Sequence, residues 1–161
     1  MQRSSWDCNG LSRDVIEFKV DKDIVLSGVR LFGSESNLYN LDALELYQGS
    51  PYSVFESPVR LVKLERSTYP SKLLESCQNF SYHGLEVLFN SNPSLKQNTL
   101  YHISVLISGA KSGKGCKGLK SVKIAGVTFT FLTPPTPTYA LGDRNSVEQG
   151  QFAEFLFSLP N

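Results

Sequence analysis

Apolar and polar residues alternate with a period close to two through most of the chain. This alternation is typical of β-strands with one buried face. It predicts strands over residues 16–20, 24–32, 85–89, 101–107, 127–131 and 151–157. The threonines at 128 and 130 fit the solvent-facing side of a sheet. The pattern therefore predicts an all-β protein with little helix.

Glycine and turn-forming residues divide these runs. Asp21, Lys22 and Asp23 separate the first two strands, which are expected to form a hairpin. Gly28 is expected to break residues 24–32 and Gly33 to end them. At both positions a side chain would block close packing or a turn with positive φ. These two glycines, together with Gly150 before the last strand, are predicted to have structural roles.

The alternation is ambiguous in two spans. Residues 41–47 fit either a short helix or a bulged strand, and residues 61–74 fit no single period. Elsewhere the dense spacing of strands and turns favours a sandwich or barrel. A chain of 161 residues with 40% hydrophobic content supports one core. We predict a single-domain antiparallel β-sandwich over residues 1–161, which is expected to be one module of a larger multidomain protein.

Charge and cysteine content limit the binding partners and the cellular location that are expected for the chain. The formal net charge of +1 gives no global attraction to nucleic acid or to an anionic membrane. No apolar run is long enough for a secretory signal or a membrane-spanning helix. Cys8, Cys77 and Cys116 are an odd, widely spaced set, which favours reduced thiols and a cytoplasmic location. The glycosylation sequon at Asn79 is the one contrary signal.

Catalytic and cofactor chemistry finds little support in the sequence. The glycine-lysine stretch over residues 109–115 lacks the spacing of a phosphate-binding loop. His83 and His102 have no histidine or cysteine at ligand spacing, so no metal site is predicted. A nucleophilic pair of Cys116 with His102 is conceivable through space, and a cysteine hydrolase ranks last among the alternatives. We predict a non-enzymatic domain without a cofactor.

Lysines recur over residues 111–123, with no acidic residue between Lys111 and Gly142. Such a segment could dock an acidic peptide or a phosphate backbone. A solvated loop that leads into an edge strand, where lysines discourage aggregation, explains the pattern better. Aromatic residues for stacking nucleic-acid bases are missing there. We therefore predict neither nucleic-acid binding nor membrane insertion.

Three segments together resemble the PHR domain, the family named after Pam and Highwire. Residues 14–34 are similar to its strand-turn-strand segment, with Phe32 at the aromatic position. Residues 98–105 resemble its polar turn before a tyrosine-led strand, and residues 145–157 resemble its closing segment. Ser146, Ala153 and the Val29-Arg30 pair depart from the family pattern, and residues 61–82 match it poorly.

The resemblance implies a protein-recognition module of large neuronal ubiquitin ligases of the Pam/Highwire type, or of BTB-containing adaptors, and the closing segment looks closer to the Pam/Highwire version. The catalytic parts of such proteins lie elsewhere in the chain. Loops at one end of the sandwich are expected to bind partner proteins or ubiquitination substrates, and the domain is expected to be monomeric. The candidate loops are residues 34–38, 111–117 and 143–149. Their candidate contact residues are Ser34, Glu35, Ser36, Asn37, Lys111, Lys114, Lys117, Asp143, Arg144 and Asn145.

An extracellular carbohydrate-binding or adhesion-type sandwich is the main alternative. It would need exposed aromatic platforms, for which Trp6, Tyr39 and Tyr52 are the candidates. It would also accommodate the sequon at Asn79. A glycan found on Asn79 in protein made by mammalian cells would favour this alternative.

Overall fold

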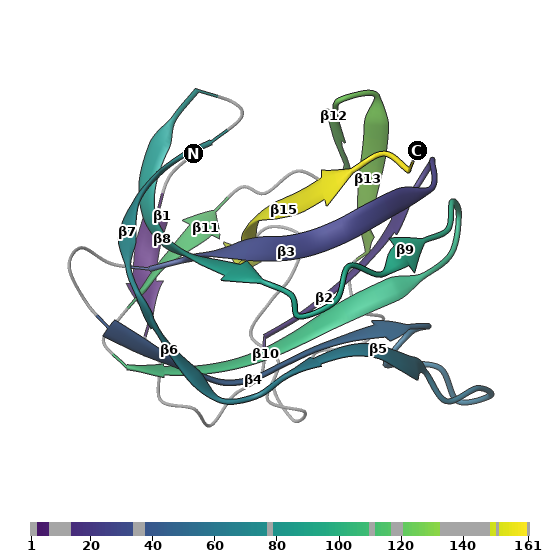
Figure 1. The fold of residues 1–161 in the computed structure, drawn as a ribbon, viewed down its shortest axis with the longest axis horizontal. Helices are drawn as coiled ribbons and strands as arrows, with labels where there is room; N and C mark the ends of the chain where they lie inside the picture. The colour runs from purple at the N-terminus through teal and green to yellow at the C-terminus, as the bar shows by residue number, and fades with distance from the viewer. Residues whose placement is uncertain are drawn as a thin grey trace.

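The computed structural model describes residues 3–6, 14–33, 38–76, 79–109, 112–116, 121–132, 149–150 and 152–160. All regular elements in these residues are strands, and all their pairings are antiparallel. Two sheets face each other across the molecule, with β3 in the upper layer and β4 and β10 in the lower layer of Figure 1. The predicted all-β sandwich is confirmed.

The lower layer is a seven-stranded sheet with β2 and β10 near its centre. β4 is long enough to pair with two short strands in succession, β5 and β6. In spatial order the strands are β12 (Ser121–Ile124), β13 (Val127–Leu132), β2 (Asp14–Val20), β10 (Tyr101–Gly109), β4 (Leu38–Gln48) and β5 (Val59–Leu64), with β6 (Ser67–Pro70) also on β4.

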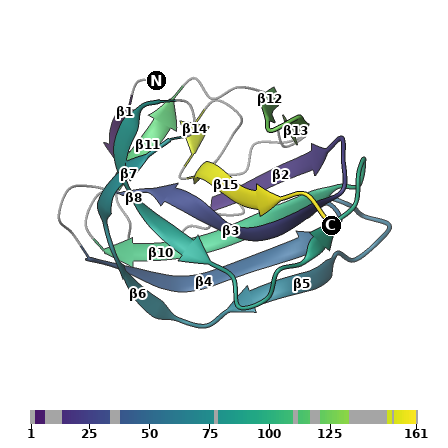
Figure 2. The same cartoon turned by 45° about the horizontal axis from the view of Figure 1, so that its top comes forward.

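The upper layer is a five-stranded sheet built around β3, and a three-stranded sheet lies beside it (Figure 2). The five-stranded sheet consists of β15 (Phe152–Ser158), β3 (Ile24–Phe32), β8 (Ser81–Leu88) and β7 (Lys72–Glu75), with β9 (Ser94–Leu95) also on β3. The three-stranded sheet consists of β1 (Arg3–Trp6), β11 (Ser112–Cys116) and β14 (Gln149–Gly150).

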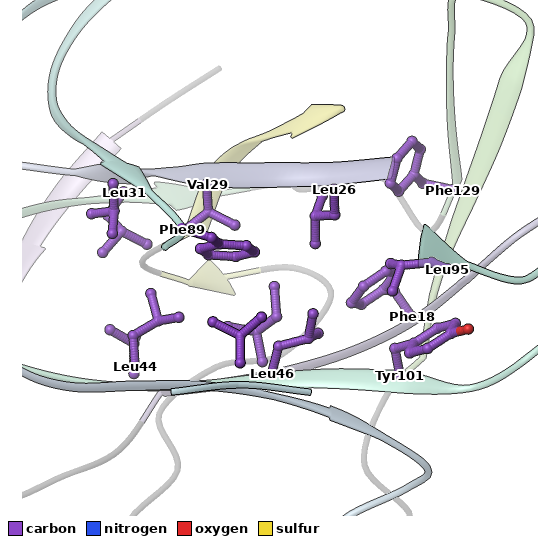
Figure 3. Close-up of a cluster of buried hydrophobic side chains, with 14 of the residues drawn as sticks. Phe18, Leu26, Val29, Leu31, Leu44, Leu46, Phe89, Leu95, Tyr101 and Phe129 are labelled. Atoms are coloured by element: carbon purple, nitrogen blue, oxygen red, sulfur yellow. The ribbon is translucent and has the colours of Figure 1, made fainter. Parts of the chain in front are cut away.

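The core fills the space between the two main sheets. Leu26, Val29 and Leu31 point from β3 toward Leu44 and Leu46 on β4, and all five are fully buried (Figure 3). Near one end, aromatic rings replace the aliphatic side chains. The Phe18 ring lies 4.8 Å from that of Phe155 and 6.3 Å from that of Phe129. The period-two alternation in the sequence therefore marks the two faces that pack together.

The hairpin predicted for residues 16–32 is wrong, because β2 and β3 belong to different sheets. The turn at residues 21–23 carries the chain across the sandwich instead. Asp21 pairs with Thr128 on β13 through two hydrogen bonds, 3.1 Å from its backbone N–H to the Thr128 carbonyl and 2.8 Å from the Thr128 N–H to its carboxylate. Each of the two strands has one apolar face. When these faces pack against each other across the sandwich, both sets of apolar side chains are buried.

The ambiguous spans form strands. Residues 41–47 lie in β4, whose pairing with β5 shifts register between Leu46 and Tyr47, so the bulged-strand reading is confirmed. Residues 61–74 contribute to β5, β6 and β7. β3 runs through Gly28 without a break, so the predicted interruption there is wrong. The pairing of β3 with its neighbour β15 in the same sheet shifts register after Leu156. Part of the loop predicted at residues 111–117 is strand β11, whose four N-terminal residues pair with β1.

The sandwich has two ends. At the β2–β3 end lie the turn at residues 21–23, the loop at 49–58 and the loop at 89–100 (Figure 1). At the β3–β4 end lie Gly33, Leu38 and Gly109, where β3 ends, β4 begins and β10 ends.

Candidate functional site

The strands that lead into two of the predicted loops come together at the β3–β4 end. Leu38, which closes the loop at 34–37, is the neighbour of Tyr39, and Tyr39 pairs with Gly109 at the end of β10. Lys114 lies within β11, opposite Ser4. The other predicted contact residues lie outside the described part of the chain, namely Ser34, Glu35, Ser36, Asn37, Lys111, Lys117, Asp143, Arg144 and Asn145. Their role in binding stays a prediction.

Hydrogen bonds fix the β2–β3 end. The carboxylate of Asp23 accepts a 2.9 Å hydrogen bond from the backbone N–H of Gln97 and lies 3.8 Å from the Lys96 ammonium. The N–H of Asn98 donates to the carbonyl of Val20 over 2.7 Å. In the 21–23 turn, Asp23 therefore holds the 89–100 loop and Asp21 holds strand β13 through Thr128, which explains why this turn needs aspartates.

The loop at residues 49–58 joins β4 to β5 and has a defined base. Gly49 has a φ of 113°, which favours glycine, and its N–H donates to the Leu100 carbonyl over 2.7 Å. The Gly49 carbonyl accepts a 2.9 Å hydrogen bond from Nδ1 of His102. A carbonyl oxygen can only accept, so the proton of this imidazole is on Nδ1. The base of the loop is thus bonded to β10.

The tip of the 49–58 loop is also ordered by its own serines. The Ser50 hydroxyl accepts a hydrogen bond from the N–H of Tyr52 over 3.1 Å. The Ser53 hydroxyl accepts from the N–H groups of Phe55 and Glu56, each over 3.3 Å. Hydroxyls that cap nearby amides in this way give a short turn a definite conformation.

This ordered tip exposes two apolar side chains. Val54 is 86% exposed and Phe55 is 94% exposed, the highest values among the exposed large hydrophobic residues in the described part of the chain. The pattern of apolar and polar residues did not predict their exposure. The available signal was a Val-Phe pair inside a serine- and proline-containing loop, where no strand alternation requires apolar residues.

The outer face of the seven-stranded sheet carries a buried polar row. Tyr47, His102 and Glu17 are neighbours across β4, β10 and β2, and the rings of Tyr47 and His102 stack with centroids 4.8 Å apart. Burial lowers the pKa of His102, opposed by its bond to Gly49 and the charge of Glu45. Burial raises the pKa of Glu17, opposed by a hydrogen bond to Ser50. Burial therefore shifts the equilibrium of both groups toward the neutral form.

The outer face of the five-stranded sheet carries a compensated charge. Arg30 on β3 contacts Glu86 on β8 at 2.8 Å and Glu154 on β15 at 2.9 Å, and donates to the Glu75 carbonyl on β7 over 2.9 Å. One guanidinium thus connects all four strands of the principal path of this sheet. Burial alone would lower the pKa of Arg30, but hydrogen bonds to Glu154 and Glu86 raise it.

Tyr82 completes this network. Its hydroxyl donates a 2.6 Å hydrogen bond to Glu154, and burial together with that bond raises the Tyr82 pKa. The Tyr82 ring packs with Phe32 and Leu74 in a small second core, against which Ala153 lies. Two departures from the family pattern, Arg30 and Ala153, therefore belong to one structural unit.

The described residues do not bring together the elements that carry Cys116 and His102, the pair considered for a cysteine hydrolase. β11, which contains Cys116, contacts β3 and β15, whereas His102 lies on the outer face of the opposite sheet. Within the described ranges no cluster of three metal-ligating side chains occurs, and no helix there has the length and apolarity to cross a membrane.

Of the aromatic residues proposed for carbohydrate binding, Tyr39 does not supply an exposed ring, Tyr52 is partly buried, and the Trp6 side chain lies outside the described part of the chain. Tyr39 is 1% exposed and belongs to the core, so its assignment as an exposed ring is wrong. The Tyr39 side chain faces inward because it alternates in phase with Leu41 on β4. Asn79 is exposed and has a φ of 65° between β7 and β8. A glycan on Asn79 therefore stays the discriminating observation for the extracellular alternative.

The glycines differ in how closely their surroundings approach. A Cβ at Gly28 would lie 2.4 Å from the carbonyl oxygen of Val87, a backbone atom on the paired strand β8. A Cβ at Gly33 would lie 2.8 Å from the Ser71 hydroxyl, which can move. Gly150 lies in β14, opposite Gly115.

Comparison with known families assigns the fold. The model of the PHR domain matches residues 1–158, nearly the entire chain. The chain belongs to the PHR domain family. Among curated proteins this PHR domain is 28% identical to BTB/POZ domain-containing protein 6-B of Danio rerio over 147 residues, which cover 89% of the chain and 26% of that protein.

A second relative gives the same picture. BTB/POZ domain-containing protein 6 of Xenopus tropicalis is 28% identical over 149 residues, which cover 89% of the chain and 24% of that protein. The chain thus spans about a quarter of the length of the curated relatives it matches. The expected closeness to the Pam/Highwire version stays a prediction, since these relatives carry a BTB/POZ domain.

Proposed function

We propose that this PHR domain is a cytoplasmic, non-catalytic module that recognises proteins for a ubiquitin ligase or a ligase adaptor. The observation that carries the proposal is the family match over residues 1–158 together with relatives that contain a BTB/POZ domain. In such an adaptor one part of the chain recruits the ligase, and the PHR domain selects what is brought to it.

The arrangement of the domain supports recognition better than chemistry. The titratable groups with shifted pKa values, such as Arg30, Tyr82 and His102, are bonded to other protein groups. They hold strands and a loop in position. A rigid sandwich that carries irregular loops at its ends is a common scaffold for binding proteins.

The finer proposal is that recognition uses the β3–β4 end, in a neuronal ligase or adaptor. Residues 34–37, 111–117 and 143–149 supply the candidate contacts, with Lys114 and Lys117 suited to an acidic partner surface. The domain acts as a monomer, and its partners are ubiquitination substrates or other proteins that the ligase or adaptor recognises.

Proximity labelling around the intact parent protein tests the role. Deletion of the PHR domain is expected to remove a defined set of labelled proteins while leaving the ligase subunits labelled. The double substitution Lys114→Glu, Lys117→Glu in the intact parent is expected to remove the acidic members of that set. The matched control is Lys63→Glu, Lys72→Glu, at exposed lysines of β5 and β7.

One outcome would count against the recognition role, and another would count only against the lysine segment. An unchanged set of labelled proteins after deletion would mean that the domain recruits nothing. Capture unaffected by the double lysine substitution, but lost on deletion, would remove the lysine segment and keep the recognition role.

A further inference from the structure

We propose that the tip of the 49–58 loop, residues 53–56, is a second protein-docking element, which inserts Phe55 and Val54 into an apolar pocket with a basic rim on a partner protein. This tip lies at the β2–β3 end, whereas Gly33, Leu38 and Gly109 mark the other end of the sandwich (Figure 1). The inference rests on the proposed recognition role and adds a second contact to it.

The two apolar side chains have no role in the fold. Phe55 and Val54 are 94% and 86% exposed and belong to neither hydrophobic core cluster. By contrast Tyr52, in the same loop, is partly buried. Loop tips are normally polar or contain glycine, and exposed side chains of this size bury a large area when a partner covers them. A binding role explains their presence, whereas stability does not.

The tip is held in one conformation before binding. The Ser53 hydroxyl bonds the amides of Phe55 and Glu56, and the base of the loop is bonded to Leu100 and His102. An ordered loop loses less conformational entropy on association than a flexible loop does. Phe55 is therefore suited to act as an anchor that enters a pocket, as aromatic residues at interface centres do.

The charges around the tip identify the kind of partner. Glu56 is the only charged residue between Gly49 and Val59, and no ion pair to it occurs within the described ranges. A carboxylate beside two apolar groups complements a pocket with Lys or Arg at its rim. An anionic membrane would repel Glu56. A two-fold contact between Phe55 residues of two copies would bring two Glu56 carboxylates together.

Photo-crosslinking in the intact parent protein tests the inference. p-Benzoylphenylalanine replaces Phe55, cells are irradiated, and mass spectrometry identifies the crosslinked protein and the residue attacked. The matched control carries the crosslinker in place of Leu88, which is 58% exposed on the outer face of β8. The expected result is a protein crosslinked from position 55 but not from 88, at an apolar site bordered by Lys or Arg.

Affinity measurements with that protein complete the test. Phe55→Ser is expected to weaken binding roughly tenfold or more, with an unchanged melting temperature. Glu56→Lys is expected to weaken it too, and a Lys or Arg→Glu change at the partner's rim is expected to restore it. Leu88→Ser is expected to leave the affinity unchanged.

Other outcomes would overturn the docking element. These are a crosslink to a second copy of the chain, a crosslink to lipid, a polar crosslinked site, or no protein from position 55 beyond that from 88. If tip variants bind normally while deletion of the domain abolishes recruitment, this inference fails and the proposed function stands. If deletion changes nothing, the proposed function fails first.

Discussion

The outer faces of the two main sheets differ in whether their buried titratable groups carry charge, although an exposed ion pair, Arg60–Glu45, also occurs on the seven-stranded sheet. On the five-stranded sheet Arg30 is ionised and compensated by Glu86 and Glu154. On the seven-stranded sheet, burial pushes both Glu17 and His102 toward their neutral forms. A charge thus stabilises the first face when its partners surround it, whereas the second face loses stability whenever its buried groups ionise.

The side chains on the outer faces stabilise the fold, whereas the loops at the ends of the sandwich are the proposed binding elements. Both outer faces secure strands or a loop, and the exposed apolar groups of the 49–58 loop do neither. Substitutions on the faces should therefore change stability, and substitutions at the ends should change binding.

We expect the largest loss of stability where a new side chain would collide with backbone atoms, because rearrangement of neighbouring side chains cannot relieve such a collision. Gly28→Val places a Cβ against the Val87 carbonyl oxygen, so β3 and β8 must separate. We expect a loss of roughly 3 kcal/mol or more in the free energy of unfolding. Urea titration measures it. At Gly33 the one close atom is the movable Ser71 hydroxyl, 2.8 Å from a Cβ, whereas Gly84 Cα lies at 3.5 Å. Gly33→Val should therefore cost less, and a larger loss for Gly33→Val would contradict this ranking.

Removal of the compensated charge should have the next largest effect. Arg30→Met leaves Glu86 and Glu154 near each other, with side chains 29% and 12% exposed. Partial exposure reduces the penalty of a fully buried pair, so we expect a loss of about 2–3 kcal/mol. The control Arg60→Met breaks a pair whose arginine is 50% exposed and should cost less than about 0.5 kcal/mol. Equal losses for both would show that the four-strand network adds nothing.

The sequence predicted the sandwich well because period-two burial is a local property. Ile103 and Val105 show the same alternation in the sequence as in the core. The partner of a strand is not local, which is why the β2–β3 hairpin was predicted wrongly. The strand at residues 3–6 has no apolar alternation and was missed.

The candidate site was less predictable for a related reason. Arg30 looked like a departure from a family motif, and its meaning depends on Glu86 and Glu154, which are 56 and 124 residues away in the chain. The exposure of Phe55 follows from where the 49–58 loop projects. The contacts of Arg30 are therefore not encoded by its neighbours in the sequence, and only the composition of the 49–58 loop indicated that Phe55 is exposed.

The seven-stranded face should show opposite pH dependences. The folded pKa of His102 lies below its ordinary 6.5, so the unfolded chain binds more protons and stability falls as pH drops below 6.5. The folded pKa of Glu17 lies above 4.5, so the folded chain keeps its proton longer and stability falls as pH rises past 4.5.

Two substitutions separate these contributions. Glu17→Gln is expected to raise the free energy of unfolding at neutral pH, because the neutral amide avoids the cost of a buried carboxylate. His102→Gln is expected to flatten the loss of stability below pH 6.5. Thermal melts across pH measure both. A destabilised Glu17→Gln at neutral pH would show that the ionised carboxylate is favoured, against the contrast between the faces.

The smallest effect on stability is expected at the 49–58 loop. Phe55→Ser should change the free energy of unfolding by less than about 0.5 kcal/mol, since the side chain makes little contact. Phe129→Ala, in the core, should cost about 3–5 kcal/mol. Chemical denaturation compares them directly. Substantial destabilisation by Phe55→Ser would give that ring a structural role.

A quantitative survey of ubiquitin-modified peptides shows whether the PHR domain selects proteins for ubiquitination. Cells would express the intact parent protein or a version lacking the PHR domain. We expect that proteins labelled only when the domain is present lose ubiquitin after its deletion, while modification of the parent itself persists. The same ubiquitin occupancy on those proteins with and without the domain would contradict this expectation.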